Sequence, residues 1–278
     1  MRFHKLEECL RSAFGRSTLS PGNGTADFAE VISESQKFYV GDVCLLEKIP
    51  MANDIPRLPY PLCCFEFRES AITETENPAG DLVGMTSSFF VVAEELGEYD
   101  KQYSDIVRTL LFMPLPMPNM QDRLWVNVGH LHLYRNTGKY NCILNKNTIK
   151  IFNGIADESY LEESVYSATQ WLFRFLSVLN CSNIEVTETA APLALNKKRL
   201  AKRKVPIYSY KTLVVKGAQK RFLSAANGTH EAPRIHLRRG HIKRRKTGNF
   251  WWEPCVVGDK KKGVVMKDYR ADGIAKAN

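Results

Sequence analysis

The 278-residue chain is long enough for one large domain or two modest ones, and its 44% hydrophobic and 25% charged residues are ordinary values for a globular protein. The longest apolar run, 171–179, is interrupted by Arg174 and is far shorter than the roughly 20 residues that a membrane span needs. Glu7 and Glu8 lie where a signal peptide needs an apolar segment. The sequence therefore predicts a cytoplasmic protein with no membrane partner.

Charge is distributed unevenly along the chain. Residues 1–195 hold 16 Lys and Arg against 25 Asp and Glu, a net −9, whereas residues 196–278 hold 23 against 5, a net +18. Charge of one sign repels itself in a compact fold and is typical of segments that a polyanion neutralises. We therefore predict an acidic portion, 1–195, and a strongly basic portion, 196–278, packed together as one compact unit whose main partner is nucleic acid, either RNA or DNA.

The residues that usually bind metals or cofactors form no recognisable motif. The seven cysteines are scattered and mostly lie in apolar segments, as Cys63 and Cys64 do, which is typical of buried, reduced thiols. No C-x-x-C pair, phosphate-binding glycine loop or Gly-x-Ser-x-Gly turn occurs. His130 and His132 share one face of an expected strand, but no acidic residue or thiol lies near them in sequence. The sequence predicts neither a metal site nor a cofactor.

The predicted elements, taken in chain order, indicate a mixture of helices and strands. Residues 5–14 are expected to form a helix, and 74–82, which contain Asn77-Pro78-Ala79-Gly80, an exposed loop. Segments rich in β-forming residues, separated by turn signals, predict strands at 62–67, 89–92, 109–112, 124–134, 141–144 and 148–152.

The clearest helix is predicted at 160–179. Apolar residues recur there at spacings of three and four, at Leu161, Val165, Ala168, Leu172, Phe175 and Leu179. This stripe predicts an α+β fold in which the helix packs on a mostly antiparallel sheet.

The chain becomes basic after a short predicted strand at 184–187. A partly helical segment is expected to end at Pro206, and a half-buried strand to follow at 207–215. Six cations of this segment are candidate nucleic-acid ligands: Lys197, Lys198, Arg199, Lys202, Arg203 and Lys204.

Residues 234–257 form the most distinctive segment, because two extended runs flank Thr247-Gly248-Asn249 and so predict a basic β-hairpin. A one-residue bulge near Gly240 would place His236, Arg238, His241 and Lys243 on a polar face opposite Ile235, Leu237 and Ile242. Cations neutralise phosphates, and a tryptophan face can stack on an unpaired base. The candidate ligands here are Arg234, Arg238, Arg239, Lys243, Arg244, Arg245, Lys246, Trp251 and Trp252.

The same segment carries a resemblance to a known group of proteins. The run His236-Leu237-Arg238-Arg239-Gly240-His241-Ile242-Lys243-Arg244, with Gly248, Trp252, Pro254 and Val256-Val257-Gly258 after it, resembles a C-terminal box in proteins of phages, prophages and actinobacterial mobile elements. Upstream, Leu195-Asn196-Lys197-Lys198-Arg199 and Tyr208-Ser209-Tyr210 resemble the segment that precedes this box. The likeness covers residues 170–270 and implies a phage or mobile-element protein in a bacterial cytoplasm, with no implication for mechanism.

Three classes of function remain open from the sequence. The first is a protein that binds nucleic acid through the basic hairpin without turnover. The second is a metal-independent nuclease in which His236 and His241 act as general acid and base while Arg238, Arg239 and Lys243 hold the phosphate. The third is an inhibitor or toxin that docks a host protein. We expect the first.

Overall fold

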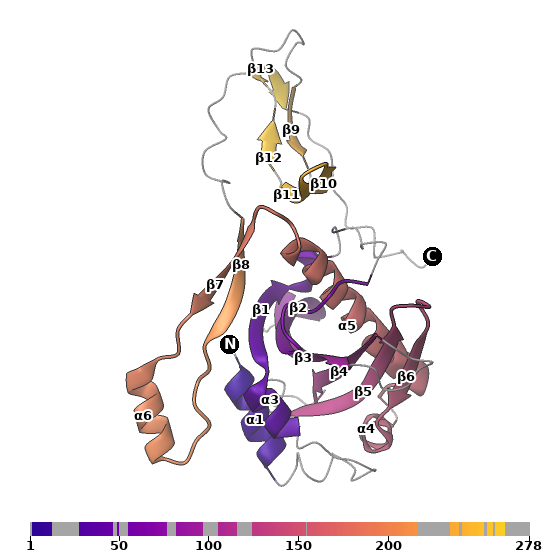
Figure 1. Ribbon diagram of the computed structural model, residues 1–278, viewed down its shortest axis with the longest axis vertical. Helices are drawn as coiled ribbons and strands as arrows, with labels where there is room; N and C mark the ends of the chain where they lie inside the picture. Colours follow the sequence, from indigo (N-terminus) through magenta and orange to yellow (C-terminus); the bar gives the residue numbers. More distant parts are fainter. Residues whose placement is uncertain are drawn as a thin grey trace.

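The computed structural model describes most of the chain, with its helices and strands arranged around one central sheet (Figure 1). The described residues are 2–12, 28–46, 49, 55–76, 82–96, 105–115, 124–153, 155–215, 234–238, 241–252, 255–257 and 259–264.

The central sheet has eight strands in the order β6-β5-β4-β3-β2-β1-β8-β7. The strands β2 to β6 form an antiparallel meander, whereas β1 runs parallel to both β2 and β8. The strands are β1 (Gln36–Asp42), β2 (Leu62–Glu76), β3 (Leu82–Leu96), β4 (Ile106–Pro114), β5 (Trp125–Tyr134), β6 (Tyr140–Leu144), β7 (Ile184–Thr189) and β8 (Tyr210–Val215).

One face of the sheet is covered by the long helix α5 (Glu158–Leu179), as Figure 1 shows. Its N-terminus is capped by Asp157, whose side chain accepts a hydrogen bond from the backbone N–H of Tyr160 at 2.8 Å. Leu161 and Leu172 are fully buried against the strands. The predicted α+β fold, with a long helix packed on a mostly antiparallel sheet, is confirmed.

The other face is covered in part by α1 (Phe3–Arg11) and α3 (Phe28–Glu34). Cys63 therefore packs on the α5 side, while its neighbour Cys64 packs on the α1 side. Because successive strand residues point to opposite faces, a strand covered on both sides needs a continuous apolar run. This explains the apolar segments of β2 and β3. Burial on the α5 side raises the pKa of the Cys63 thiol to about 12.

The strand predicted at 148–152 is wrong, because these residues belong to helix α4 (Lys146–Phe152). The side chain of Asn145 caps the helix by accepting a hydrogen bond from the N–H of Asn147 at 3.0 Å. Thr148 and Phe152, four residues apart, are both buried on one face of the helix. Capping and i, i+4 burial here outweigh the β propensity of the segment.

The loop predicted at 74–82 is also wrong at both of its ends. Strand β2 continues to Glu76 and β3 begins at Leu82, with these two residues paired. Helix α3 and strand β1 were not predicted. In β1 the buried residue Lys37, only 6% exposed, interrupts the apolar pattern that would have revealed a strand.

The basic third of the chain adds helix α6 (Leu193–Ala201) and two small sheets. The strands β10 (His241–Arg245) and β11 (Gly248–Trp252) pair as a hairpin, which confirms the predicted basic hairpin. The strand β9 (Arg234–Arg238) pairs antiparallel with β12 (Cys255–Val257), as expected for the outer ends of the hairpin predicted over 234–257, and also with β13 (Asp259–Val264), which was not predicted. No helix in the described part of the chain has the length and apolar character needed to cross a membrane.

Replacing Leu172 by Ala should lower the free energy of unfolding by about 2–5 kcal/mol, because its fully buried side chain leaves a cavity between α5 and the sheet. Urea or thermal unfolding measures the change. Leu193→Ala is the matched control, since Leu193 is 78% exposed on α6. Equal unfolding curves for the two variants would contradict the assignment of α5 to the core.

Candidate nucleic-acid interface

The hairpin of β10 and β11 is closed by a two-residue turn at Lys246 and Thr247. Arg245 pairs with Gly248, so the turn lies one residue earlier than the predicted Thr247-Gly248-Asn249. Gly248 has φ +120°, a backbone conformation that residues with a Cβ rarely adopt. Glycine at this position is therefore what lets the second strand start directly after the turn.

The hairpin packs against the end of helix α5. The backbone N–H of Ser182 donates a hydrogen bond to the carbonyl of Asn249 at 2.7 Å, and Ile242 packs against the main hydrophobic core. A Cβ on Gly248 would lie only 2.7 Å from the Ser182 hydroxyl oxygen. Glycine thus also permits the close approach of the hairpin to the segment that follows α5.

The face of the hairpin opposite Ile242 brings cations and aromatic rings together. Strand pairing places Lys243 beside Phe250 and, two pairs along on the same face, His241 beside Trp252. The Lys243 ammonium lies 5.0 Å from the centre of the Trp252 ring, and the Arg245 guanidinium lies 5.5 Å from that of Phe250. Both cations are exposed and both rings are half-buried. We call Lys243, Arg245, Phe250 and Trp252 the basic–aromatic face.

Sequence reasoning included three of these four residues but missed Phe250. The signal that would have identified it is the register of the hairpin, because residues paired across two strands share one face. Placing the turn one residue too late moves Phe250 out of line with Lys243. An error of one residue in the turn was therefore enough to hide half of the aromatic surface.

A second group of cations lies on α6 and the turn after it. Lys197, Lys198, Lys202, Arg203 and Lys204 are all exposed. The helix is held to the following segment by Asn196, whose side-chain amide exchanges two hydrogen bonds of 2.8 Å with the backbone of Ile207. The cations are thus carried on a fixed helix. The same helix also exposes the apolar side chains Leu193, Leu195 and Leu200.

Arg199 differs from the other predicted cations of this segment. Its guanidinium donates one hydrogen bond to the carbonyl of Val205 and another to a carboxylate oxygen of Glu8 on α1, both at 2.8 Å. Its side chain is only 18% exposed. The structure therefore gives Arg199 the role of attaching α6 to α1 rather than of presenting a charge to a partner.

The two basic groups are not brought together. The hairpin contacts Ser182, just before β7, whereas α6 follows the other end of β7. Figure 1 accordingly shows α6 and the β10–β11 hairpin at opposite ends of the ribbon formed by β7 and β8. A single compact patch of all the predicted cations is therefore excluded.

Several predicted residues lie outside what the structure describes. Arg239 and the predicted bulge at Gly240 are among them, and for a further set only the backbone is described: Arg234, His236, Arg238, His241, Arg244 and Trp251. His236 lies on β9 and His241 on β10, which belong to different sheets. The pairing of these two histidines as acid and base stays a prediction.

His130 and His132 lie side by side on β5, with ring centres 4.9 Å apart. Arg108, paired with His132 across the sheet, forms an ion pair with Glu94 on β3. Burial, the neighbouring His132 and Arg108 lower the pKa of His130 to about 4, and burial and Arg108 lower that of His132. Among the described residues, no three His, Cys, Asp or Glu side chains are placed to hold a metal ion.

This pair should make the fold sensitive to acid. In the unfolded chain both histidines take up a proton near pH 6.5, whereas in the folded protein they stay neutral to lower pH. The stability they provide is therefore complete above about pH 6.5 and falls as the pH drops toward 4. His130→Gln combined with His132→Gln should flatten this fall, as measured by urea unfolding across that window. A parallel loss in the unmodified protein and the double variant would contradict the prediction.

Comparison with known proteins adds no relative to this picture. No protein-family model, curated protein or solved structure matches the chain.

Proposed function

We propose that this protein binds single-stranded nucleic acid through the basic–aromatic face of the β10–β11 hairpin. The observation that carries the proposal is the juxtaposition of Lys243 and Arg245 with Trp252 and Phe250 on one face, while Ile242 on the other packs against the core. Cations beside aromatic rings match the alternation of phosphates and bases along a single strand. A double helix would not offer unpaired bases to the rings.

Comparing the energy of a cation–π contact with that of base stacking favours a transfer of Lys243 and Arg245 from the ring faces to phosphates when a strand binds. An exposed cation–π contact contributes about 0.5–1 kcal/mol, whereas stacking a base on an aromatic side chain contributes about 1–3 kcal/mol. When a strand binds, Lys243 and Arg245 leave the ring faces for phosphates, and bases take their place on Trp252 and Phe250. In the free protein the cations cover the rings and limit contact between apolar surfaces of separate molecules.

The exposed cations of α6 supply a second contact with the phosphate backbone. Five of them lie within eight residues, and the segment 196–278 as a whole carries net +18. Such contacts are independent of sequence and weaken with salt, because binding releases counterions from the nucleic acid. We infer that α6 adds affinity and the hairpin adds the preference for single strands.

The proposed cellular setting follows from the same segment of sequence. The resemblance of 236–258 to the box found in phage and mobile-element proteins supports a protein that acts in the cytoplasm of a bacterial host. There it meets single strands of either RNA or DNA, and the basic–aromatic face has no feature that selects between them.

Replacing Lys243 and Arg245 together by Ala should weaken binding to all sequences about equally. If each side chain contacts one phosphate, the slope of log affinity against log salt should fall by about 1.4, at roughly 0.7 per contact on a single strand. Fluorescence anisotropy with a labelled oligonucleotide at several salt concentrations measures the slope. Both side chains are exposed, so the fold should be unchanged.

The matched control is the double variant Lys146→Ala and Lys150→Ala, which removes two exposed cations from α4. It removes the same net charge and should leave the slope nearly unchanged. Equal losses in the two double variants would show that only net charge matters and would contradict the proposed face. Binding of a protein that persists after nuclease treatment, without affinity for oligonucleotides, would instead favour docking through α6.

Replacing Trp252 by Leu should separate stacking from charge. Affinity for a single strand should fall by roughly five- to 150-fold, the equivalent of about 1–3 kcal/mol for one stacked base, while the salt slope stays the same. Duplex affinity, measured in the same assay, should change little. A parallel loss for duplex and single strand would contradict base stacking on Trp252. Cleavage of the labelled strand would revive the nuclease hypothesis.

A further inference from the structure

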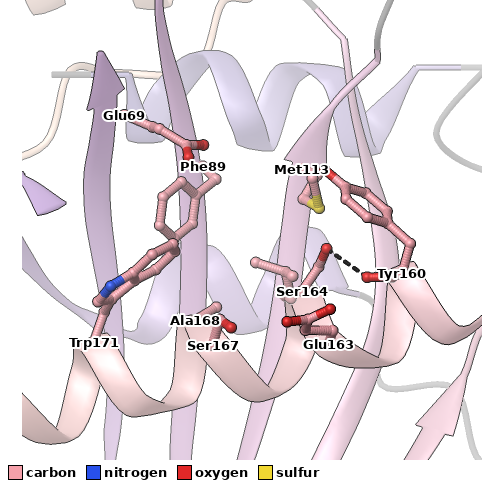
Figure 2. Close-up of a pocket in the computed structure, with 10 residues that line it drawn as sticks. Glu69, Phe89, Met113, Tyr160, Glu163, Ser164, Ser167, Ala168 and Trp171 are labelled. Atoms are coloured by element: carbon pink, nitrogen blue, oxygen red, sulfur yellow. Dashed lines mark hydrogen bonds between the residues drawn. The ribbon is translucent and has the colours of Figure 1, made fainter. Parts of the chain in front are cut away.

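A cavity of about 260 Å³ lies between helix α5 and the strands β2, β3 and β4. Figure 2 shows it bounded along α5 by Tyr160 at one end and Trp171 at the other. Between these two large residues the helix lines the cavity with the small side chains of Ser164, Ser167 and Ala168 and with Glu163 at the rim. The cavity exists because small residues occupy positions where larger ones would fill the space against the sheet.

The floor and one end of the cavity are apolar and aromatic. Phe89 and Trp171 lie with ring centres 5.5 Å apart and planes at 42°, and Leu111 and Ala168 are buried beneath. Trp171 is half-buried, so part of its ring remains available to a ligand. This end suits a small apolar group, and its aromatic faces also attract cations.

The rim of the cavity presents hydrogen-bond acceptors. Glu69 lies on the β2 side and Glu163 on α5, both exposed carboxylates. The hydroxyl of Ser164 donates to the carbonyl of Tyr160 at 2.8 Å, so its oxygen offers lone pairs to a ligand (Figure 2). None of the described lining residues is a lysine or an arginine, so the charged side chains among them are both acidic.

We propose that this cavity binds a small organic cation with an apolar body, such as an aryl-alkyl amine. The apolar body would occupy the space beside Phe89 and Trp171, while the ammonium group would donate to Glu163 or Ser164. The cavity is smaller than the roughly 300–1,000 Å³ of sites for drug-sized ligands, which favours a ligand with one ring or a short chain. The cavity is lined by residues distant in sequence from the cations of the proposed nucleic-acid interface, and its charged residues are of the opposite sign. The proposed ligand site therefore does not depend on nucleic-acid binding.

The test is a titration of the full chain with 2-phenylethylamine and, separately, with 2-phenylethanol, which has the same ring but no charge. The indole N–H resonance of Trp171, identified by its absence in Trp171→Phe, reports binding at the cavity. We expect the amine to shift this resonance and to bind more tightly than the alcohol, with an affinity that falls as salt is added. Equal binding of the two compounds, or no shift with millimolar amine, would overturn the proposal.

Single substitutions at the rim make the test specific. Glu163→Gln should weaken amine binding by roughly two- to fivefold, as expected for one partly exposed ion pair. Glu162→Gln is the matched control, because Glu162 is the exposed neighbour on the same helix and does not line the cavity. Equal effects of the two variants would overturn the assignment. Neither variant should alter oligonucleotide binding by more than its small change in net charge, so the two proposals fail or succeed separately.

Discussion

The pairing of β8 with β1 joins the basic third of the chain to the acidic body, and the positions of α6 and of the β10–β11 hairpin depend on it. Phe38 on β1 pairs with Lys211 on β8, and the Lys211 ammonium donates to the side chain of Gln36 at 2.9 Å. The rings of Tyr39 and Tyr210 meet edge to face beside this pair. Because β8 also pairs with β7, this junction fixes the ribbon whose ends carry α6 and the hairpin.

A buried polar cluster strengthens the same junction. The Lys37 ammonium donates to the carbonyls of Ser33 and Ser35 at 2.8 and 2.6 Å and lies 4.1 Å from the centre of the Tyr208 ring. The hydroxyl of Tyr208 donates to the Glu7 carboxylate on α1. Burial lowers the pKa of Lys37 and raises that of Tyr208. Burying a polar group without a hydrogen-bond partner costs free energy. This cluster therefore favours the one position of the basic segment in which these groups are paired.

The sequence was sufficient to predict an element where one residue pattern dominates the segment. The apolar stripe of α5 predicted the helix, and segments rich in β-forming residues predicted part or all of each strand from β2 to β6. It failed where a polar residue is buried, as Lys37 is in β1, and where capping by Asn145 turned a β-forming segment into α4. The first failure has a tertiary cause, since the ring of Tyr208 from a distant segment lies over the Lys37 ammonium. The second has a local cause, because the capping residue Asn145 directly precedes the helix.

The two proposed sites differed in how far they could be predicted. The cations of the hairpin and of α6 were visible as charge, yet only the paired strands showed that Lys243 and Trp252 share a face. The cavity beneath α5 was not predictable, since Ser164 and Ser167 read as ordinary polar positions until β2 to β4 are placed opposite. Charged residues can be identified in a sequence, whereas a cavity depends on how strands distant in sequence pack against the helix.

The ribbon of β7 and β8 also sets a separation between the two basic groups. Each strand has six residues, which corresponds to roughly 20 Å. A nucleic acid bound at the hairpin would reach α6, at a high effective concentration, only if it is long enough to extend along the ribbon. A short nucleic acid would contact one basic group and dissociate quickly, whereas a longer one would contact both. The fold would thereby favour ligands by their length rather than by their sequence.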